Sequence, residues 1–260
     1  MPEVDELMRA LDAALRPARW PVSCHAYGRA DQQVADLRLP ARGTGPFPVV
    51  VLLHGGFWRD RYRRDLMAPI AVDVARRGFA SWNVEYRRVG SGGGVPATLD
   101  DIAAALDALG DLDAPIDRNR VAVVGHSAGG HLALVAARHR LIAAAVAQAG
   151  VCDLTAGHRL AIGAGAVDDF MAGPPGERAD AYRRADPMRA LPLGVLQLLV
   201  HGDADPTVPV ELSRAYAGRA AALGDACTLI ELPGVGHFEL IDPRDPSWPA
   251  TVQWITASLG

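Results

Sequence analysis

Lysine is absent from this 260-residue chain, and all 26 of its basic residues are arginine. The chain therefore has no amine side chain that could act as a nucleophile or form a Schiff base. Its 30 acidic residues outnumber the basic ones, and the net charge is −4. This charge does not favour binding to nucleic acid or to an anionic membrane.

Cysteine is scarce, with three residues far apart in the sequence: Cys24, Cys152 and Cys227. Their odd number and wide spacing predict neither a disulfide framework nor a metal knuckle. The chain also lacks H-E-x-x-H, H-x-H and paired-cysteine motifs. We therefore expect no metal ion and no cofactor.

Long apolar runs are missing as well. No segment approaches the roughly 18 apolar residues that a membrane-spanning helix needs. The acidic stretch at residues 1–6 has no apolar core of the kind found in signal peptides. Together with the unpaired cysteines, these features predict a cytoplasmic protein that acts on a small molecule, without nucleic-acid or membrane partners. The sequence leaves a homodimer open.

Half of the residues are hydrophobic, and the length suits one α/β domain covering residues 1–260. Expected strands alternate with expected helices, which predicts a mainly parallel sheet with helices on both faces. The expected strands are 22–27, 34–39, 48–53, 79–86, 120–126, 143–149, 195–200 and 228–232, and the expected helices are 4–15, 66–77, 98–109, 209–223 and 248–259.

Residues 151–190 interrupt this alternation. They are rich in glycine and proline, and they carry a polar patch at 177–186. We expect this segment to be a short lid-like or cap-like insertion in the single domain.

The stretch from Val121 to Gly130 is typical of a strand, a sharp turn and a helix, with Ser127 at the turn. A serine in such a G-x-S-x-G turn has strained backbone, and its hydroxyl projects above the sheet edge. Glycine at positions 125 and 129 fits this interpretation, because a side chain there would collide with the neighbouring strand or helix. Ser127 is therefore the candidate nucleophile.

An acid and a base follow two other expected strands. Asp205 comes after one strand and His237 after the next, and ligands bind at the carboxyl ends of strands in such sheets. The order Ser, Asp, His is that of the α/β hydrolases. We expect His237 to take the proton of Ser127 and pass it to the leaving group, while Asp205 holds the imidazole in the required tautomer.

The segment His54-Gly-Gly-Phe-Trp58 follows another expected strand. Its glycines let the backbone approach a bound oxyanion. We predict an oxyanion hole formed by the N–H groups of Gly56, Phe57 and Ala128. Loss of one such donor typically costs about 3–4 kcal/mol of transition-state stabilisation.

Several neighbouring residues have competing interpretations. Asp203 is the alternative acid, but Asp205 is favoured because Asp-Pro-x-Val-Pro begins the loop toward the next helix. His54 is expected to order the oxyanion loop by hydrogen bonds. His131 is expected to pack or to orient a neighbour, and His201 to be structural.

The substrate-binding candidates are Trp58, His126 and Phe238. Trp58 is either a wall of the binding pocket or part of the core, and the sequence leaves both open. His126 is the variable position of the serine turn, where packing or orientation is the competing role.

These motifs resemble the α/β-hydrolase superfamily over about residues 20–258. The H-G-G-x-W form at 54–58 is similar to the kynurenine formamidase (arylformamidase) group and related small esterases, and also to hormone-sensitive-lipase-like esterases. The latter usually carry a third glycine where this chain has Phe57. Tyr86-Arg87 and the His-Gly-Asp-x-Asp-x-x-Val-Pro segment also resemble the formamidase group. The resemblance implies an α/β-hydrolase fold and cofactor-free hydrolysis of N-formyl-kynurenine or a similar aryl formamide.

Other functions compete with this one. Short-chain carboxylesterases and arylesterases share the same motifs and are the main alternative. An exopeptidase or carbohydrate esterase is less favoured, because peptidases of this fold usually need an acidic pair or an added domain to hold a free amino terminus. A non-catalytic binding protein is least favoured, since such proteins usually lose a triad member and this chain has all three.

Overall fold

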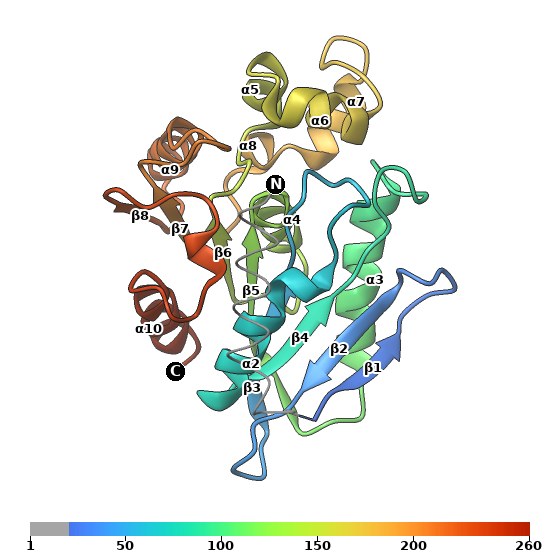
Figure 1. Ribbon diagram of the computed structural model, residues 1–260, viewed down its shortest axis with the longest axis vertical. Coiled ribbons are helices and arrows are strands. Elements are labelled where there is room, and N and C mark those ends of the chain that lie inside the picture. Colours follow the sequence, from blue (N-terminus) through green and yellow to red (C-terminus); the bar gives the residue numbers. More distant parts are fainter. Residues whose placement is uncertain (1–20) are drawn as a thin grey trace.

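The structure, a computed structural model, describes residues 21–260. An eight-stranded sheet lies at its centre, with helices on both faces (Figure 1). In order across the sheet, the strands are β1 (Ser23–Ala26), β2 (Val34–Arg38), β4 (Ala80–Val84), β3 (Phe47–Leu53), β5 (Ile116–His126), β6 (Ala144–Gln148), β7 (Leu196–Gly202) and β8 (Cys227–Leu232). The expected helix at 4–15 lies outside the described residues.

The strands β3 to β8 pair in parallel, whereas β1 and β2 form an antiparallel hairpin at one edge. This confirms the predicted α/β class and its mainly parallel sheet. β5 begins four residues earlier than expected, because its extension lets Ile116 pair with Phe47 of β3.

The helices follow the expected order, and one of them differs in detail. The helix expected at 66–77 begins as a 3₁₀ turn, η1 (Arg64–Met67), and continues as α2 (Ala68–Arg76). Pro69 lies in the first turn of α2, where its missing N–H costs nothing. The remaining helices outside the insertion are α3 (Ala97–Asp111), α4 (Ala128–Ala136), α9 (Glu211–Ala222), the 3₁₀ turn η2 (Glu239–Ile241) and α10 (Trp248–Leu259).

The hydrophobic core is divided by the sheet, and β3 shows why its sequence is continuously apolar. Side chains alternate between the two faces of a strand. Val51 therefore packs in a cluster with Leu106 of α3, and the next residue, Leu52, packs in a second cluster with Ile70 of α2 and Val252 of α10. A strand covered by helices on both sides needs apolar residues at every position.

The 151–190 insertion forms four helices, which lie beyond the carboxyl ends of the strands (Figure 1). The sequence pattern did not predict these helices. They are α5 (Leu154–Arg159), α6 (Ile162–Met171), α7 (Ala179–Ala185) and α8 (Pro187–Ala190). The start of α6 is a left-handed turn, because Ala161 and residues 163–165 all have positive φ. Nowhere in residues 21–260 does a helix combine the length and apolar character needed to cross a membrane.

Candidate active site

Ser127 lies at a strained turn between β5 and α4. Its backbone has φ 57° and ψ −118°, a conformation that L-residues rarely adopt. A Cβ at Gly125 would lie 1.9 Å from the carbonyl oxygen of Gly129, and a Cβ at Gly129 would lie 2.1 Å from that of Leu53. The N–H of Ser127 donates to the Gln148 carbonyl on β6 at 2.8 Å. The predicted need for glycine at both positions therefore has a direct steric cause.

The structure brings His237 and Asp205 together. Nδ1 of His237 lies 2.6 Å from Oδ2 of Asp205, and both side chains are buried. Because a carboxylate only accepts, Nδ1 carries the hydrogen and Nε2 is left as the basic nitrogen. The other carboxylate oxygen accepts the N–H groups of Thr207 and Val208 at 2.7 and 3.0 Å. Asp203, the alternative acid, is exposed and accepts instead from the N–H of Gly234.

His201 also contacts Asp205, which the sequence interpretation missed. Its Nε2 lies 3.2 Å from Oδ2 of Asp205 and 2.9 Å from the Val208 carbonyl oxygen, so this nitrogen must donate. Its Nδ1 lies 2.7 Å from Oγ of Ser213. Burial would raise the pKa of Asp205, but hydrogen bonds from His201 and His237 outweigh it and hold that pKa well below its usual range. The four-residue spacing of His201 and Asp205 around one strand end is the signal that could have revealed this contact.

The oxyanion loop, residues 54–59, passes directly against the serine turn. A Cβ at Gly55 would lie 3.1 Å from the Cβ of Ser127. Gly56 has φ 114° and Phe57 has φ 58°, so the loop is strained where its N–H groups are needed. Within residues 21–260, the N–H groups of Gly56, Phe57 and Ala128 donate to no protein acceptor. All three are therefore free to bind an oxyanion.

His54 fixes the start of this loop, as expected. Its Nδ1 lies 2.8 Å from the Gly55 carbonyl oxygen, and its Nε2 lies 3.1 Å from Oε1 of Glu85. The ring stacks on Tyr86 at 4.3 Å, and the Tyr86 hydroxyl donates to the His54 carbonyl. Burial would raise the pKa of Glu85, but its bonds to His54 and to the Arg64 N–H lower it overall. No motif marks Glu85 in the sequence.

Trp58 does not take the substrate-binding place expected of it. Its side chain is 0% exposed and lies outside the cavities at the serine and at His237. The indole stacks on Phe170 of α6 at 4.6 Å and donates from Nε1 to Nδ1 of His131 at 3.2 Å. The alternative interpretation, a core residue, is the one that the structure shows.

His126 is buried beside the base. Its Nε2 lies 2.8 Å from the carbonyl oxygen of His237, so this nitrogen donates, and the two rings are 4.6 Å apart. Burial lowers the pKa of His126 to about 3, which keeps the ring neutral. His126 therefore orients the backbone that carries His237, and it also lines the cavity at Ser127.

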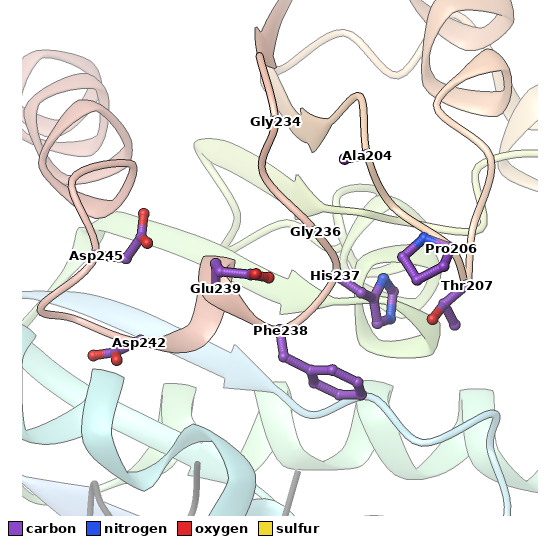
Figure 2. A pocket seen from close by; sticks show the side chains of 10 residues that line it. All are labelled: Ala204, Pro206, Thr207, Gly234, Gly236, His237, Phe238, Glu239, Asp242 and Asp245. Carbon is purple, nitrogen blue, oxygen red and sulfur yellow. The ribbon is translucent and has the colours of Figure 1, made fainter. Parts of the chain in front are cut away.

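Two spaces of very different size meet at His237. A cavity of about 20 Å³ lies at Ser127 and holds roughly one water molecule. A groove of about 720 Å³ is lined by His237 and Phe238 and by residues from neighbouring loops, Ala204 and Asp245 among them (Figure 2). Thr207, His237 and Phe238 line both spaces. Among the described residues, no group of three or more His, Cys, Asp or Glu side chains could hold a metal ion.

The sequence model of the BD-FAE family matches residues 35–219, which is more than half of the chain. The chain belongs to the BD-FAE family. This family member is 28% identical to esterase LipC of Mycobacterium tuberculosis (strain ATCC 25618 / H37Rv) in an alignment 249 residues long, which covers 83% of this chain. The match spans 59% of LipC, so the chain covers about three fifths of that curated relative.

Solved structures share the fold of this BD-FAE chain at low identity. A truncated carbohydrate esterase from gut microbiota matches with a TM-score of 0.77 and 20% identity, over 93% of this chain and 98% of its own. Inhibited esterase B from Lactobacillus rhamnosis matches with a TM-score of 0.80 and 19% identity, over 99% and 96%. Propionate-bound Est2 from Thermogutta terrifontis matches with a TM-score of 0.73 and 21% identity, over 93% and 95%. The chain therefore has the α/β-hydrolase fold that these esterase structures share.

Proposed function

We propose that the protein is a carboxylesterase that hydrolyses esters of short acyl groups. The observation that carries this proposal is the difference in size between the two spaces at His237. The cavity of about 20 Å³ at Ser127 leaves room for no more than a small acyl group, whereas the groove of about 720 Å³ suits a larger alcohol.

In the proposed mechanism, Ser127 Oγ attacks the ester carbonyl carbon while Nε2 of His237 takes the hydroxyl proton. The carbonyl electron pair moves onto oxygen, and the N–H groups of Ala128, Gly56 and Phe57 bind this oxyanion. Collapse of the tetrahedral intermediate breaks the ester bond, and the imidazolium protonates the departing alcohol. Water then attacks the acyl-enzyme, with His237 again as base, and releases the acid.

Asp205 stabilises the imidazolium in this scheme. Its carboxylate is buried and accepts four hydrogen bonds or close N–H contacts, so it stays ionised while His237 gains its proton. His126 stays neutral beside it and therefore adds no competing positive charge.

The comparisons support ester hydrolysis in particular. The curated relative LipC and all three reported structures are named esterases, one of them a carbohydrate esterase, and one of the structures holds propionate, a short acid. None of the reported relatives is named as a formamidase.

A second candidate, hydrolysis of an aryl formamide, is favoured by the same small cavity, because formyl is the smallest acyl group. The H-G-G-F-W segment resembles the formamidase group as well. In this case too, Ser127 and His237 would have the same roles, and the aryl amine would leave through the groove.

One substrate panel tests both candidates. We expect kcat/KM on p-nitrophenyl esters to fall at least about tenfold from acetate to octanoate, since each misplaced methylene costs about 1–3 kcal/mol. N-formyl-kynurenine is measured beside p-nitrophenyl acetate, and turnover of the ester alone removes the formamide candidate. Preference for octanoate contradicts the short-acyl proposal. Ser127→Ala should lower kcat by orders of magnitude, and an active variant contradicts the mechanism.

A further inference from the structure

Three consecutive residues of the oxyanion loop contact the 151–190 insertion. Phe57 and Trp58 make apolar contacts with it, and Arg59 makes polar ones. Bonds from the rest of the protein hold the loop as well, among them the one from the Val89 N–H to the Trp58 carbonyl at 2.8 Å and those at His54. The insertion thus contacts the end of the loop that follows the N–H groups of Gly56 and Phe57.

The Arg59 guanidinium bridges this loop to α6. Nη1 donates to the Gly163 carbonyl at 2.8 Å, and Nη2 donates to the Ala164 carbonyl at 3.2 Å. Nε and Nη2 also donate to Oδ2 of Asp169, at 3.1 and 2.6 Å. One planar side chain thus binds two successive carbonyl groups and a carboxylate, which only the fork of an arginine can do.

The two carbonyl groups belong to the left-handed turn at the start of α6. Ala161 and Ala164 have φ 47° and 52°, a conformation that is unfavourable for alanine. A turn of this kind persists only when its surroundings fix it. Arg59 fixes it by binding its carbonyl groups from the side of the oxyanion loop.

This left-handed turn also shapes the space for the Phe57 ring. A Cβ at Gly163 would lie only 2.3 Å from Cδ1 of the Phe57 ring, so the ring occupies the hollow that this glycine leaves. Just beyond it, Trp58 stacks on Phe170 with 13° between the planes. Phe57 and Trp58 both have left-handed backbone, at φ 58° and 56°, so contacts outside the loop must hold its shape.

We propose that Arg59 is a positioning residue for the oxyanion hole, and that the insertion is a fixed support of the catalytic loop. By holding the left-handed turn of α6 against Phe57, Arg59 fixes the direction of the Gly56 and Phe57 N–H groups. This inference rests on the proposed function, because it concerns the same acyl-transfer site.

If the Arg59–Asp169 pair only stabilised the fold, its loss would have little effect on the reaction. Arg59 and Asp169 are 35% and 49% exposed, and such surface pairs add little to stability. Arg183 and Asp180 form a more exposed Arg–Asp pair on α7, at 69% and 76%, with no hydrogen bond to the oxyanion loop. Arg183→Ala is therefore the matched control for Arg59→Ala.

The experiment measures the second-order rate at which a fluorophosphonate inactivates the enzyme, because the phosphoryl oxygen of this probe occupies the oxyanion hole. For Arg59→Ala we expect inactivation and kcat on p-nitrophenyl acetate both to fall about 10- to 100-fold, with KM nearly unchanged, since small misplacements of a catalytic group have effects of this size. For Asp169→Asn, the inactivation rate and kcat should fall less, because both bonds from Arg59 to the carbonyl groups remain. Arg183→Ala should match the wild type.

Equal inactivation rates in Arg59→Ala and the wild type, or an effect on KM alone, would overturn the inference. If Arg59→Ala does not fold, the folded Asp169→Asn variant takes its place. Equal inactivation rates in Asp169→Asn and Arg183→Ala would then overturn the inference as well. A wild-type enzyme that the probe does not label contradicts the proposed function instead, so the two failures are distinguishable.

Discussion

Acid should destabilise the folded protein between about pH 6.5 and pH 5, because two buried histidines are held neutral. Burial lowers the pKa of His131 to about 4 and that of His126 to about 3, against a usual value of 6.5. Unfolded chains bind protons at these histidines as the pH falls through 6.5, whereas the folded chain does not. The stability that depends on the neutral rings is therefore complete above pH 6.5 and is lost as the pH falls toward the folded values.

The size of this effect follows from the shifts. A difference of one pKa unit corresponds to about 1.4 kcal/mol, so each histidine removes about 2 kcal/mol of stability between about pH 6.5 and pH 5. Together His126 and His131 remove about 4 kcal/mol, which is a large part of the roughly 5–15 kcal/mol that stabilises a typical domain.

The assay is urea unfolding at several pH values across this window, for the wild type and His131→Gln. The variant loses the Trp58 and Ala185 contacts of His131, so it should be less stable at neutral pH. As the pH falls, its free energy of unfolding should nevertheless decrease less steeply than that of the wild type. The two slopes should differ by about 1.4 kcal/mol per pH unit. Phe170→Leu is the control, since it removes a ring that packs on His131 but keeps the titrating group. An equal slope in His131→Gln and the wild type would refute the reasoning.

Two further predictions concern the serine turn and the acid. Gly125→Ala should prevent a stable fold, because its Cβ would lie 1.9 Å from a backbone oxygen, and urea unfolding or solubility measures this. A stable and active Gly125→Ala would show that the turn is not as described. Asp205→Asn should lower kcat about 10⁴-fold by favouring the wrong imidazole tautomer. Asp203→Asn should keep kcat within about twofold, since surface changes of this kind have small effects, and the reverse ranking would assign the acid to Asp203.

Much of the fold could be predicted because its signals are local. The apolar run at 48–53 reports burial on both faces, and the glycines at 125 and 129 report close backbone contacts that the structure contains. The order of Ser127, Asp205 and His237 placed each group after a different parallel strand, and the sheet brings these strand ends to one edge.

The parts that could not be predicted depend on contacts between distant segments. Trp58 is buried because α6 brings Phe170 over it, and no residue near position 58 in the sequence indicates this contact. The support from Glu85 to His54 spans 31 residues and needs the pairing of β3 with β4. The left-handed turn at 161–165 includes two alanines, which no propensity rule places there.

The strand order also places the proposed nucleophile and the proposed base in surroundings of different stability. Ser127 follows β5, which has β3 and β6 on its two sides, whereas His237 follows β8, which pairs with β7 alone and is only partly buried. Edge elements open at lower free energy than the centre of a sheet. Local fraying of β8 would displace His237 while Ser127 keeps its native surroundings. The lifetime of the proposed active site would then depend on this edge strand and not on the stability of the core.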